Sequence, residues 1–161
     1  GARTLAAPRF VPVFFSGDDA TIQMSAIDFL ARIGASDFWK QTTSEYGVGP
    51  GTSSAPVLLA EAAPATIADS AIKTWLAGKL NSADPAFPAV TSDDIFVLFY
   101  PSGVTITLNS NGTVSRSCQG FGAYHGNIRL DANHKQQRVA YAVIPRCRGF
   151  GGGSRFFRFA A

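Results

Sequence analysis

The sequence predicts a single α/β (α+β) domain with a mixed β-sheet, two or three packed helices and an antiparallel hairpin toward the C-terminal end. Three patterns support this fold class. Residues 95–101, IFVLFYP, form a continuous apolar run that is typical of an interior strand. Apolar residues recur at helical spacing in residues 20–33 and 66–80. Asn111-Gly112 follows alternating apolar positions and is a strong hairpin signal.

The first half of the chain reads as strand, helix, short helix and loop. Residues 9–17 are rich in aromatic and β-branched residues and predict a buried strand that ends at Ser-Gly. Asp18 and Asp19 offer a helix cap, Gly34 a stop, and Ser36 the cap of a short second helix. The apolar stripe of the first helix consists of Ile22, Ala26, Phe29, Leu30 and Ile33. Residues 47–56 have the composition of a flexible loop.

The second half adds a strand at residues 56–61 and a helix for which Thr66 and Asp69 resemble a capping box. The apolar stripe of this helix comprises Ile67, Ala71, Ile72, Trp75, Leu76 and Leu80. Residues 81–94 are Pro-rich and predict a surface connection. After the hairpin, residues 139–144 predict another strand that stops at Pro145. We therefore expect one globular domain over residues 1–147, followed by a Gly/Arg/Phe-rich tail over residues 148–161.

Composition favours a folded, exported protein. Apolar residues make up 46% of the chain and charged residues 16%, which excludes general disorder. No apolar run is long enough to cross a bilayer, and Gly1 suggests a mature or trimmed product of a secreted, extracellular protein. Cys118 and Cys147 are the two cysteines, and we expect them to form a disulfide; two buried free thiols are the alternative.

Charge is divided unequally along the chain. Residues 1–100 carry six Lys/Arg and ten Asp/Glu, a net of −4, whereas residues 101–161 carry eight and one, a net of +7, which together give +3. A basic half of this kind suits phosphates, an acidic polymer such as an acidic polysaccharide, or a membrane surface. The alternative is that arginines simply solvate strand faces and loops.

The tail concentrates arginine and phenylalanine without any acidic residue. Arginine can neutralise phosphate or acidic glycan while phenylalanine stacks on rings. Alternatively, the tail serves self-association or contact with a second chain, with its phenylalanines packed on the sheet or on another subunit. A third interpretation is that it stands in place of a lost catalytic helix. The candidate binding residues are Arg146, Arg148, Arg155, Phe156, Phe157, Arg158 and Phe159.

Several strings together resemble a family of secreted bacterial zincin-like metallopeptidases. They are VPVFF, FWKQTTSEYGVG, TIADSAIKTWL, IFVLFYPSGVTI, CQGFGAYHG and VAYAVIPRC, and they extend from about residue 9 to residue 147. The resemblance implies that the last strand leads into a helix with a His-Glu pair and a further Glu that bind zinc. Here RGFGGGSRFFRFAA follows that strand and contains neither His nor Glu. The family's metal ligands therefore have no counterpart in this chain.

The remaining chemistry centres on residues 121–127, FGAYHGN. Glycines beside Tyr124 and His125 let a ligand approach the backbone, and His125 can transfer a proton near neutral pH, so both are candidate catalytic residues. The alternative is a histidine that is hydrogen-bonded in a turn or at a strand end. A metal site at His125 completed by Asp131 or Glu45 is conceivable, but we predict no metal site and no cofactor, with zinc present only if its ligands come from elsewhere.

The sequence thus favours a secreted zincin-like scaffold without peptidase activity of its own. If it is active, we expect a zinc metallopeptidase whose metal-binding helix is not in this chain. The different-class alternative is a non-enzymatic extracellular binding or self-assembling protein that uses its basic, aromatic C-terminal half.

Overall fold

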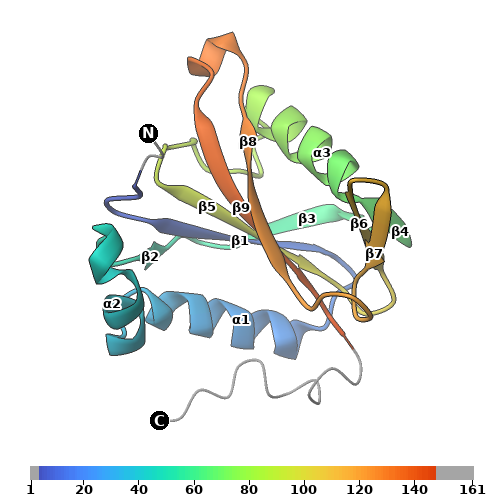
Figure 1. The fold of residues 1–161 in the computed structure, drawn as a ribbon, viewed down its shortest axis with the longest axis horizontal. Coiled ribbons are helices and arrows are strands. Elements are labelled where there is room, and N and C mark those ends of the chain that lie inside the picture. The colour runs from blue at the N-terminus through green and yellow to red at the C-terminus, as the bar shows by residue number, and fades with distance from the viewer. Residues whose placement is uncertain (1–3, 148–161) are drawn as a thin grey trace.

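The computed structural model describes residues 4–147 and confirms the predicted α/β fold class (Figure 1). The helices are α1 (Ala20–Ile33), α2 (Asp37–Thr43) and α3 (Asp69–Asn81), with short 3₁₀ helices η1 (Ser44–Tyr46) and η2 (Ala132–His134). The strands are β1 (Arg9–Ser16), β2 (Thr52–Ser53), β3 (Val57–Ala62), β4 (Thr66–Ala68), β5 (Asp94–Tyr100), β6 (Thr105–Ser110), β7 (Thr113–Arg116), β8 (Tyr124–Arg129) and β9 (Arg138–Pro145).

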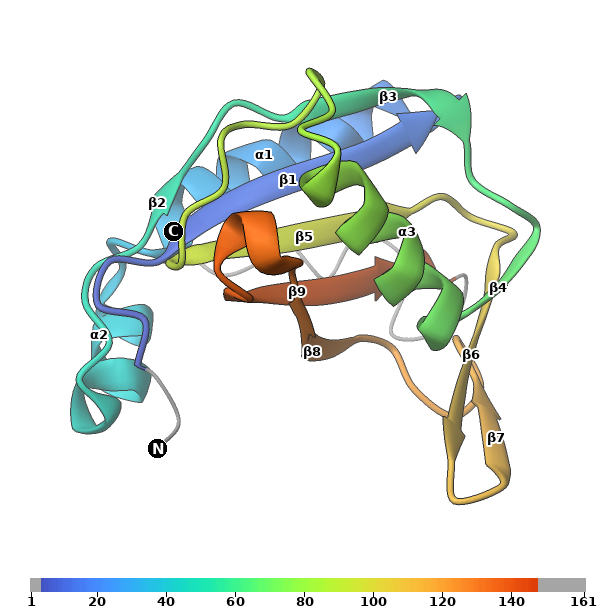
Figure 2. The same cartoon turned by 90° about the horizontal axis from the view of Figure 1, so that it is seen from above.

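The main sheet has six strands in the order β2-β1-β5-β9-β8, with β3 also paired to β1 (Figure 2). Every pair in this sheet is parallel except β8 with β9, which is antiparallel. A smaller sheet joins β4, β6 and β7. Within residues 4–147, β8 therefore forms one edge of the main sheet.

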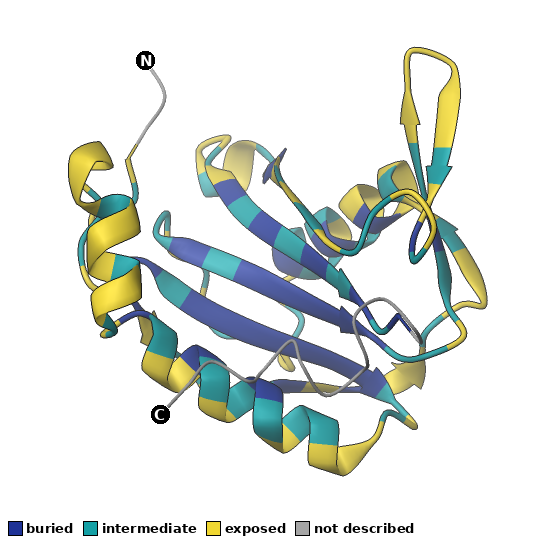
Figure 3. Cartoon of the chain, turned by 60° about the horizontal axis from the view of Figure 1, so that its bottom comes forward, coloured by how far each residue is buried: buried dark blue, intermediate teal, exposed yellow. Residues whose placement is uncertain are grey.

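The main sheet buries apolar side chains on both faces, and α1 and α3 cover opposite faces (Figures 1 and 2). On β1, Val11, Val13 and Phe15 face the α3 side, while Phe10 and Phe14 face the α1 side. The burial pattern shows dark, buried central strands bordered by exposed outer elements (Figure 3). Because both faces are covered, the central strands read as continuous apolar runs.

Several local predictions are confirmed. Asp19 caps α1, since its carboxylate accepts hydrogen bonds from the backbone N–H groups of Thr21 and Ile22. The Ser36 hydroxyl caps α2 in the same way. The turn between β6 and β7 places Asn111 at φ 52° and Gly112 at φ 86°, the left-handed conformation that a tight hairpin turn requires.

Other local predictions were wrong or incomplete. Thr66 lies in β4, which pairs in parallel with β6, so Ala68 occupies the N-cap of α3 and no capping box forms. The predicted loop 47–56 contains β2, and Ala71 of the predicted apolar stripe is exposed. Strand β8 had no predicted counterpart. The stripe residues Ile72, Leu76 and Leu80 are buried, as expected of the core-facing side of α3.

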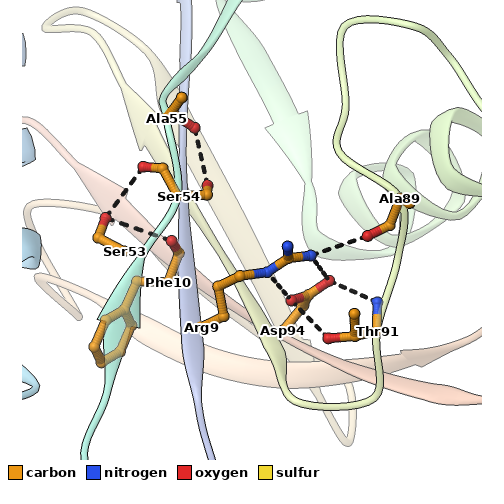
Figure 4. A network of polar contacts seen from close by, with 8 residues as sticks. All are labelled: Arg9, Phe10, Ser53, Ser54, Ala55, Ala89, Thr91 and Asp94. Carbon is orange, nitrogen blue, oxygen red and sulfur yellow. Dashed lines mark hydrogen bonds and ion pairs between the residues drawn. The ribbon is translucent and has the colours of Figure 1, made fainter.

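A buried ion pair fixes the start of the two central strands. Asp94 is fully buried, and its carboxylate accepts hydrogen bonds from Arg9 Nε at 2.6 Å and Arg9 Nη2 at 2.8 Å (Figure 4). The same carboxylate accepts hydrogen bonds from the Thr91 backbone N–H and hydroxyl, and Arg9 Nη2 also donates to the Ala89 carbonyl. Four donors therefore satisfy the buried charge, which is the condition for burying one.

We expect Asp94→Asn to lower the free energy of unfolding by about 2–4 kcal/mol, because it leaves the partly buried Arg9 guanidinium without its counter-charge. Urea unfolding followed by circular dichroism measures the loss. Thr91→Val is the matched control, since it removes one hydroxyl donor and should cost only about 1 kcal/mol. Equal effects of the two variants would contradict a dominant role for the ion pair.

Candidate functional site

The two candidate catalytic residues lie next to each other on β8 but on opposite faces of the sheet. Tyr124 is half-buried on the α3 side, where it packs at 6.3 Å between ring centroids from Tyr141. His125 is exposed and stands opposite Ala142, a residue of the α1-side core. Successive side chains of a strand point to opposite faces. The structure therefore does not bring Tyr124 and His125 together.

Tyr124 instead belongs to a polar cluster at the start of α3, which we call the Asp69 cluster: Asp69, Lys73, Tyr100, Tyr124 and Tyr141. The Tyr141 hydroxyl donates a hydrogen bond of 2.6 Å to Asp69 Oδ1. Lys73 Nζ lies 2.6 Å from Asp69 Oδ2 in an i, i+4 ion pair on the same helix. The Asp69 carboxylate thus lies between the Lys73 ammonium group on α3 and the Tyr141 hydroxyl on β9.

Burial and hydrogen bonding lower the pKa of Asp69 and raise the pKa of the tyrosines in this cluster. Burial by itself would raise the pKa of Asp69, but hydrogen bonds from Lys73 and then Tyr141 outweigh it and lower the pKa. Burial, followed by the Asp69 charge, raises the pKa of Tyr124. Burial, followed by the hydrogen bond to Asp69, raises the pKa of Tyr141. The cluster is therefore a carboxylate surrounded by neutral phenols, and the tyrosines are hydrogen-bond donors rather than bases.

The hydroxyl oxygens of Tyr100 and Tyr124 are buried, and within residues 4–147 neither meets the geometric criteria for a hydrogen bond. The Tyr124 hydroxyl nevertheless interacts with the Asp69 carboxylate and helps to lower the pKa of Asp69, whereas the Tyr100 hydroxyl has no such partner there. The packing around Tyr141 is also tight, because a Cβ at Gly126 would lie 2.9 Å from the Tyr141 hydroxyl oxygen. The absence of a side chain at Gly126 thus leaves room for the Tyr141 ring, whose hydroxyl donates to Asp69. This arrangement can hold a small polar group, such as a water molecule, by hydrogen bonding.

Arg146 is the only predicted tail-binding residue that lies within the described part of the chain. Its guanidinium forms an ion pair with the Asp18 carboxylate, whose side chain is 1% exposed. Arg148, Arg155, Phe156, Phe157, Arg158 and Phe159 lie outside the described residues. Arg146 therefore has an internal partner where the sequence suggested an external one.

The predicted disulfide is confirmed: Cys118 and Cys147 are bonded across a sequence separation of 29 residues. The bond joins the end of β9 to the segment between β7 and β8. Closing a loop of this length stabilises the fold by about 3–4 kcal/mol in the chain-entropy model. It anchors the chain just beyond Arg146.

The described residues do not bring together the ligands that a zinc ion needs. Residues 4–147 contain no group of three or more His, Cys, Asp or Glu side chains that could hold a metal ion. The segments outside them, residues 1–3 and 148–161, contain none of these residue types. His125 also lacks the ligands that Asp131 or Glu45 would have had to supply, since no such group forms.

Compared with protein-family models, curated proteins and solved structures, the chain gives no match. In the described residues, no helix has the length and apolar character that crossing a membrane requires. The fold class is therefore established by the structure alone, and the function has to be argued from its surfaces and cavities.

Sequence reasoning missed the central member of the polar cluster. Asp69 was interpreted as part of a helix cap, whereas its main partner, Tyr141, lies 72 residues further along the chain. The one local signal was the i, i+4 spacing of Asp69 and Lys73, which predicts an ion pair on a helix. No sequence pattern linked that pair to Tyr141.

We expect Tyr141→Phe to lower the free energy of unfolding by about 1–2 kcal/mol near neutral pH, because it removes a hydrogen bond to a charged carboxylate. The pKa of Asp69 is lowered in the folded state, so this contribution is present above the ordinary pKa of an aspartate and disappears as pH falls through the folded-state value. Urea unfolding of both proteins at about pH 7 and at about pH 2 should therefore show a difference that vanishes in acid. A pH-independent difference would assign the effect to packing.

Proposed function

We propose that the chain is a secreted zincin-like scaffold domain without peptidase activity of its own, and that it binds an extended peptide along β8. The observation that carries this proposal is the position of β8. Within residues 4–147 it pairs only with β9, so one side of its backbone is left to pair with another chain. Adding a strand to a free sheet edge is a common way for proteins to recognise extended peptides.

The side chains of β8 give the edge a chemical preference. His125, Asn127 and Arg129 are exposed along one face of the strand, and Arg138 of β9 stands opposite Arg129. Arg138 Nη1 donates to the Asn127 side-chain oxygen at 3.2 Å. Two arginines close together without a carboxylate partner in the strand pair favour an acidic peptide.

The edge is also mechanically supported. β9, the neighbour of β8, lies between β8 and β5 in the sheet and is anchored by the disulfide at its C-terminal end. A rigid edge reduces the ordering cost of binding, because only the peptide must be ordered. The resemblance to zincin-like peptidases supports a peptide ligand, and the absence of zinc ligands supports binding without cleavage.

The alternative function is non-enzymatic binding or self-assembly through the basic and aromatic C-terminal half, and its candidate binding residues in the tail lie outside the described part of the chain except for Arg146. Arg146 is paired with Asp18. The β8 edge remains open to a second copy of the chain as well as to a peptide. Light scattering of the purified protein distinguishes these two occupants.

We expect acidic, extended peptides to bind the chain more tightly than basic peptides of the same length. Fluorescence anisotropy with labelled peptides measures the affinities, and alternate N-methylation of the peptide backbone should abolish binding because it removes the donors that pair with β8. Arg129→Glu should weaken binding of the acidic peptide, with Arg32→Glu on the exposed surface of α1 as the matched control. Equal binding of the N-methylated peptide would eliminate strand addition.

We also expect the purified chain to hold no stoichiometric zinc and to cleave none of the peptides it binds, because three protein ligands for a catalytic zinc are not assembled. Elemental analysis after dialysis and mass spectrometry of the incubated peptides provide the measurements. One tightly held zinc per chain, or a cleavage product that a chelator suppresses, would overturn the scaffold proposal.

A further inference from the structure

A second, separate feature is a cavity of about 420 Å³ at the C-terminal end of α3. It lies where α3, the connection 82–93 and η2 meet. Leu80, Phe87 and Val90 supply apolar walls, and Lys79, Asp84 and His134 supply polar groups. Its volume falls within the range of about 300–1,000 Å³ that is typical of small-molecule sites, and so does its combination of apolar walls with a few polar groups.

The walls of this cavity are held in place by specific contacts. The Asn81 side-chain oxygen at the end of α3 accepts a hydrogen bond of 3.1 Å from the Asp131 backbone N–H, which ties η2 to the helix. Ala83 on one side and Lys135 and Gln136 on the other have positive φ angles of 50–52°. Residues other than glycine rarely adopt this conformation, and such residues concentrate at functional sites.

The cations beside the cavity already have carboxylate partners. Lys79 Nζ lies 3.0 Å from Asp84 Oδ2 and 3.6 Å from Glu61 Oε1. The wall residue Ala89 accepts a hydrogen bond from Arg9, which is itself paired with Asp94. Neither Lys79 nor Arg9 is therefore left to pair with an anionic ligand.

His134 contributes its imidazole to the cavity wall. Its Nδ1 lies 3.1 Å from Asp131 Oδ1, and the carboxylate favours a proton on that nitrogen. In the neutral imidazole, Nε2 is then a hydrogen-bond acceptor. The cavity therefore combines apolar walls with an imidazole that, in this tautomer, can accept one hydrogen bond.

We propose that this cavity binds a small neutral molecule with an apolar body and one hydroxyl group, an alcohol or a phenol, whose hydroxyl donates to His134 Nε2. The site is distinct from the β8 edge, so the inference stands or falls independently of the peptide-binding proposal. The ligand in this cavity packs against Leu80 and Phe87, which belong to the α3-side core. A charged analogue of the same size is excluded by the cost of desolvating its charge.

Nuclear magnetic resonance titration of the full chain with phenol tests the proposal. The chain has two histidines, His125 and His134, so their imidazole signals can be told apart. The signals of His134 should shift on addition of phenol, while those of His125, which does not line the cavity, should stay unchanged. Benzoate and toluene are the comparison probes. Phenol should bind roughly fivefold more tightly than toluene, as expected for one net hydrogen bond, and benzoate should show no measurable binding because its charge would have to be desolvated. Equal binding of benzoate, or shifts at His125 alone, would overturn the proposal.

Substitutions at His134, His125 and Val90 test where phenol binds. In His134→Ala, phenol affinity measured from backbone amide shifts should fall to that of toluene, whereas His125→Ala should leave phenol binding unchanged. Val90→Phe should reduce binding of all probes by filling the cavity, provided that circular dichroism shows a folded protein. If Val90→Phe does not fold, the His134→Ala result still decides, and unchanged phenol binding in that variant contradicts the assigned acceptor.

Discussion

The pairing of Arg9 with Asp94 is the constraint on which the main sheet depends. These residues are direct register partners at the beginning of β1 and β5, two strands that contribute side chains to both cores. Asp94 has no access to water, so a shift of one residue between the strands would leave its carboxylate without Arg9. The same shift would exchange the two faces of a strand. A polar interaction thus selects one register among several that apolar strands alone would tolerate.

Given that register, side-chain alternation along the strands determines which residues lie on each face of the main sheet. The α3 face carries aliphatic side chains together with Phe15, Phe96 and the tyrosines of the Asp69 cluster, whereas the α1 face carries the stacked rings of Phe14 and Phe99 at 4.8 Å. Within the Asp69 cluster, Tyr124 lies on β8 and Tyr141 on β9, beside the central strands β1 and β5. This cluster is therefore placed toward the margin of the sheet, where partial exposure reduces the cost of burying it, whereas the buried Asp94 on β5 relies on its hydrogen-bond donors.

The elements that sequence predicted well are those whose signals are local. β1, β5, α1 and the hairpin turn at Asn111-Gly112 are determined by apolar periodicity, a cap or a backbone conformation within a few residues. β8 was missed because YHGNIR lacks apolar alternation and contains a glycine, whose role appears only when Tyr141 packs against it. β4 was missed because three residues carry too little pattern, and their pairing with β6 spans a long stretch of chain.

The candidate sites also depend on contacts between distant residues, which local sequence patterns do not predict. Tyr124 and His125 are neighbours in sequence, yet the pleat of β8 assigns one to a buried cluster and the other to solvent. Asp69 and Tyr141, far apart in sequence, share a hydrogen bond. Both proposed sites nevertheless use the β8–β9 pair: its free edge faces a peptide, and the connection between the strands carries His134 into the cavity. Anchoring β9 by the disulfide and by Arg146 therefore positions both sites, because the strand that supports the edge also sets where its connecting turn meets α3.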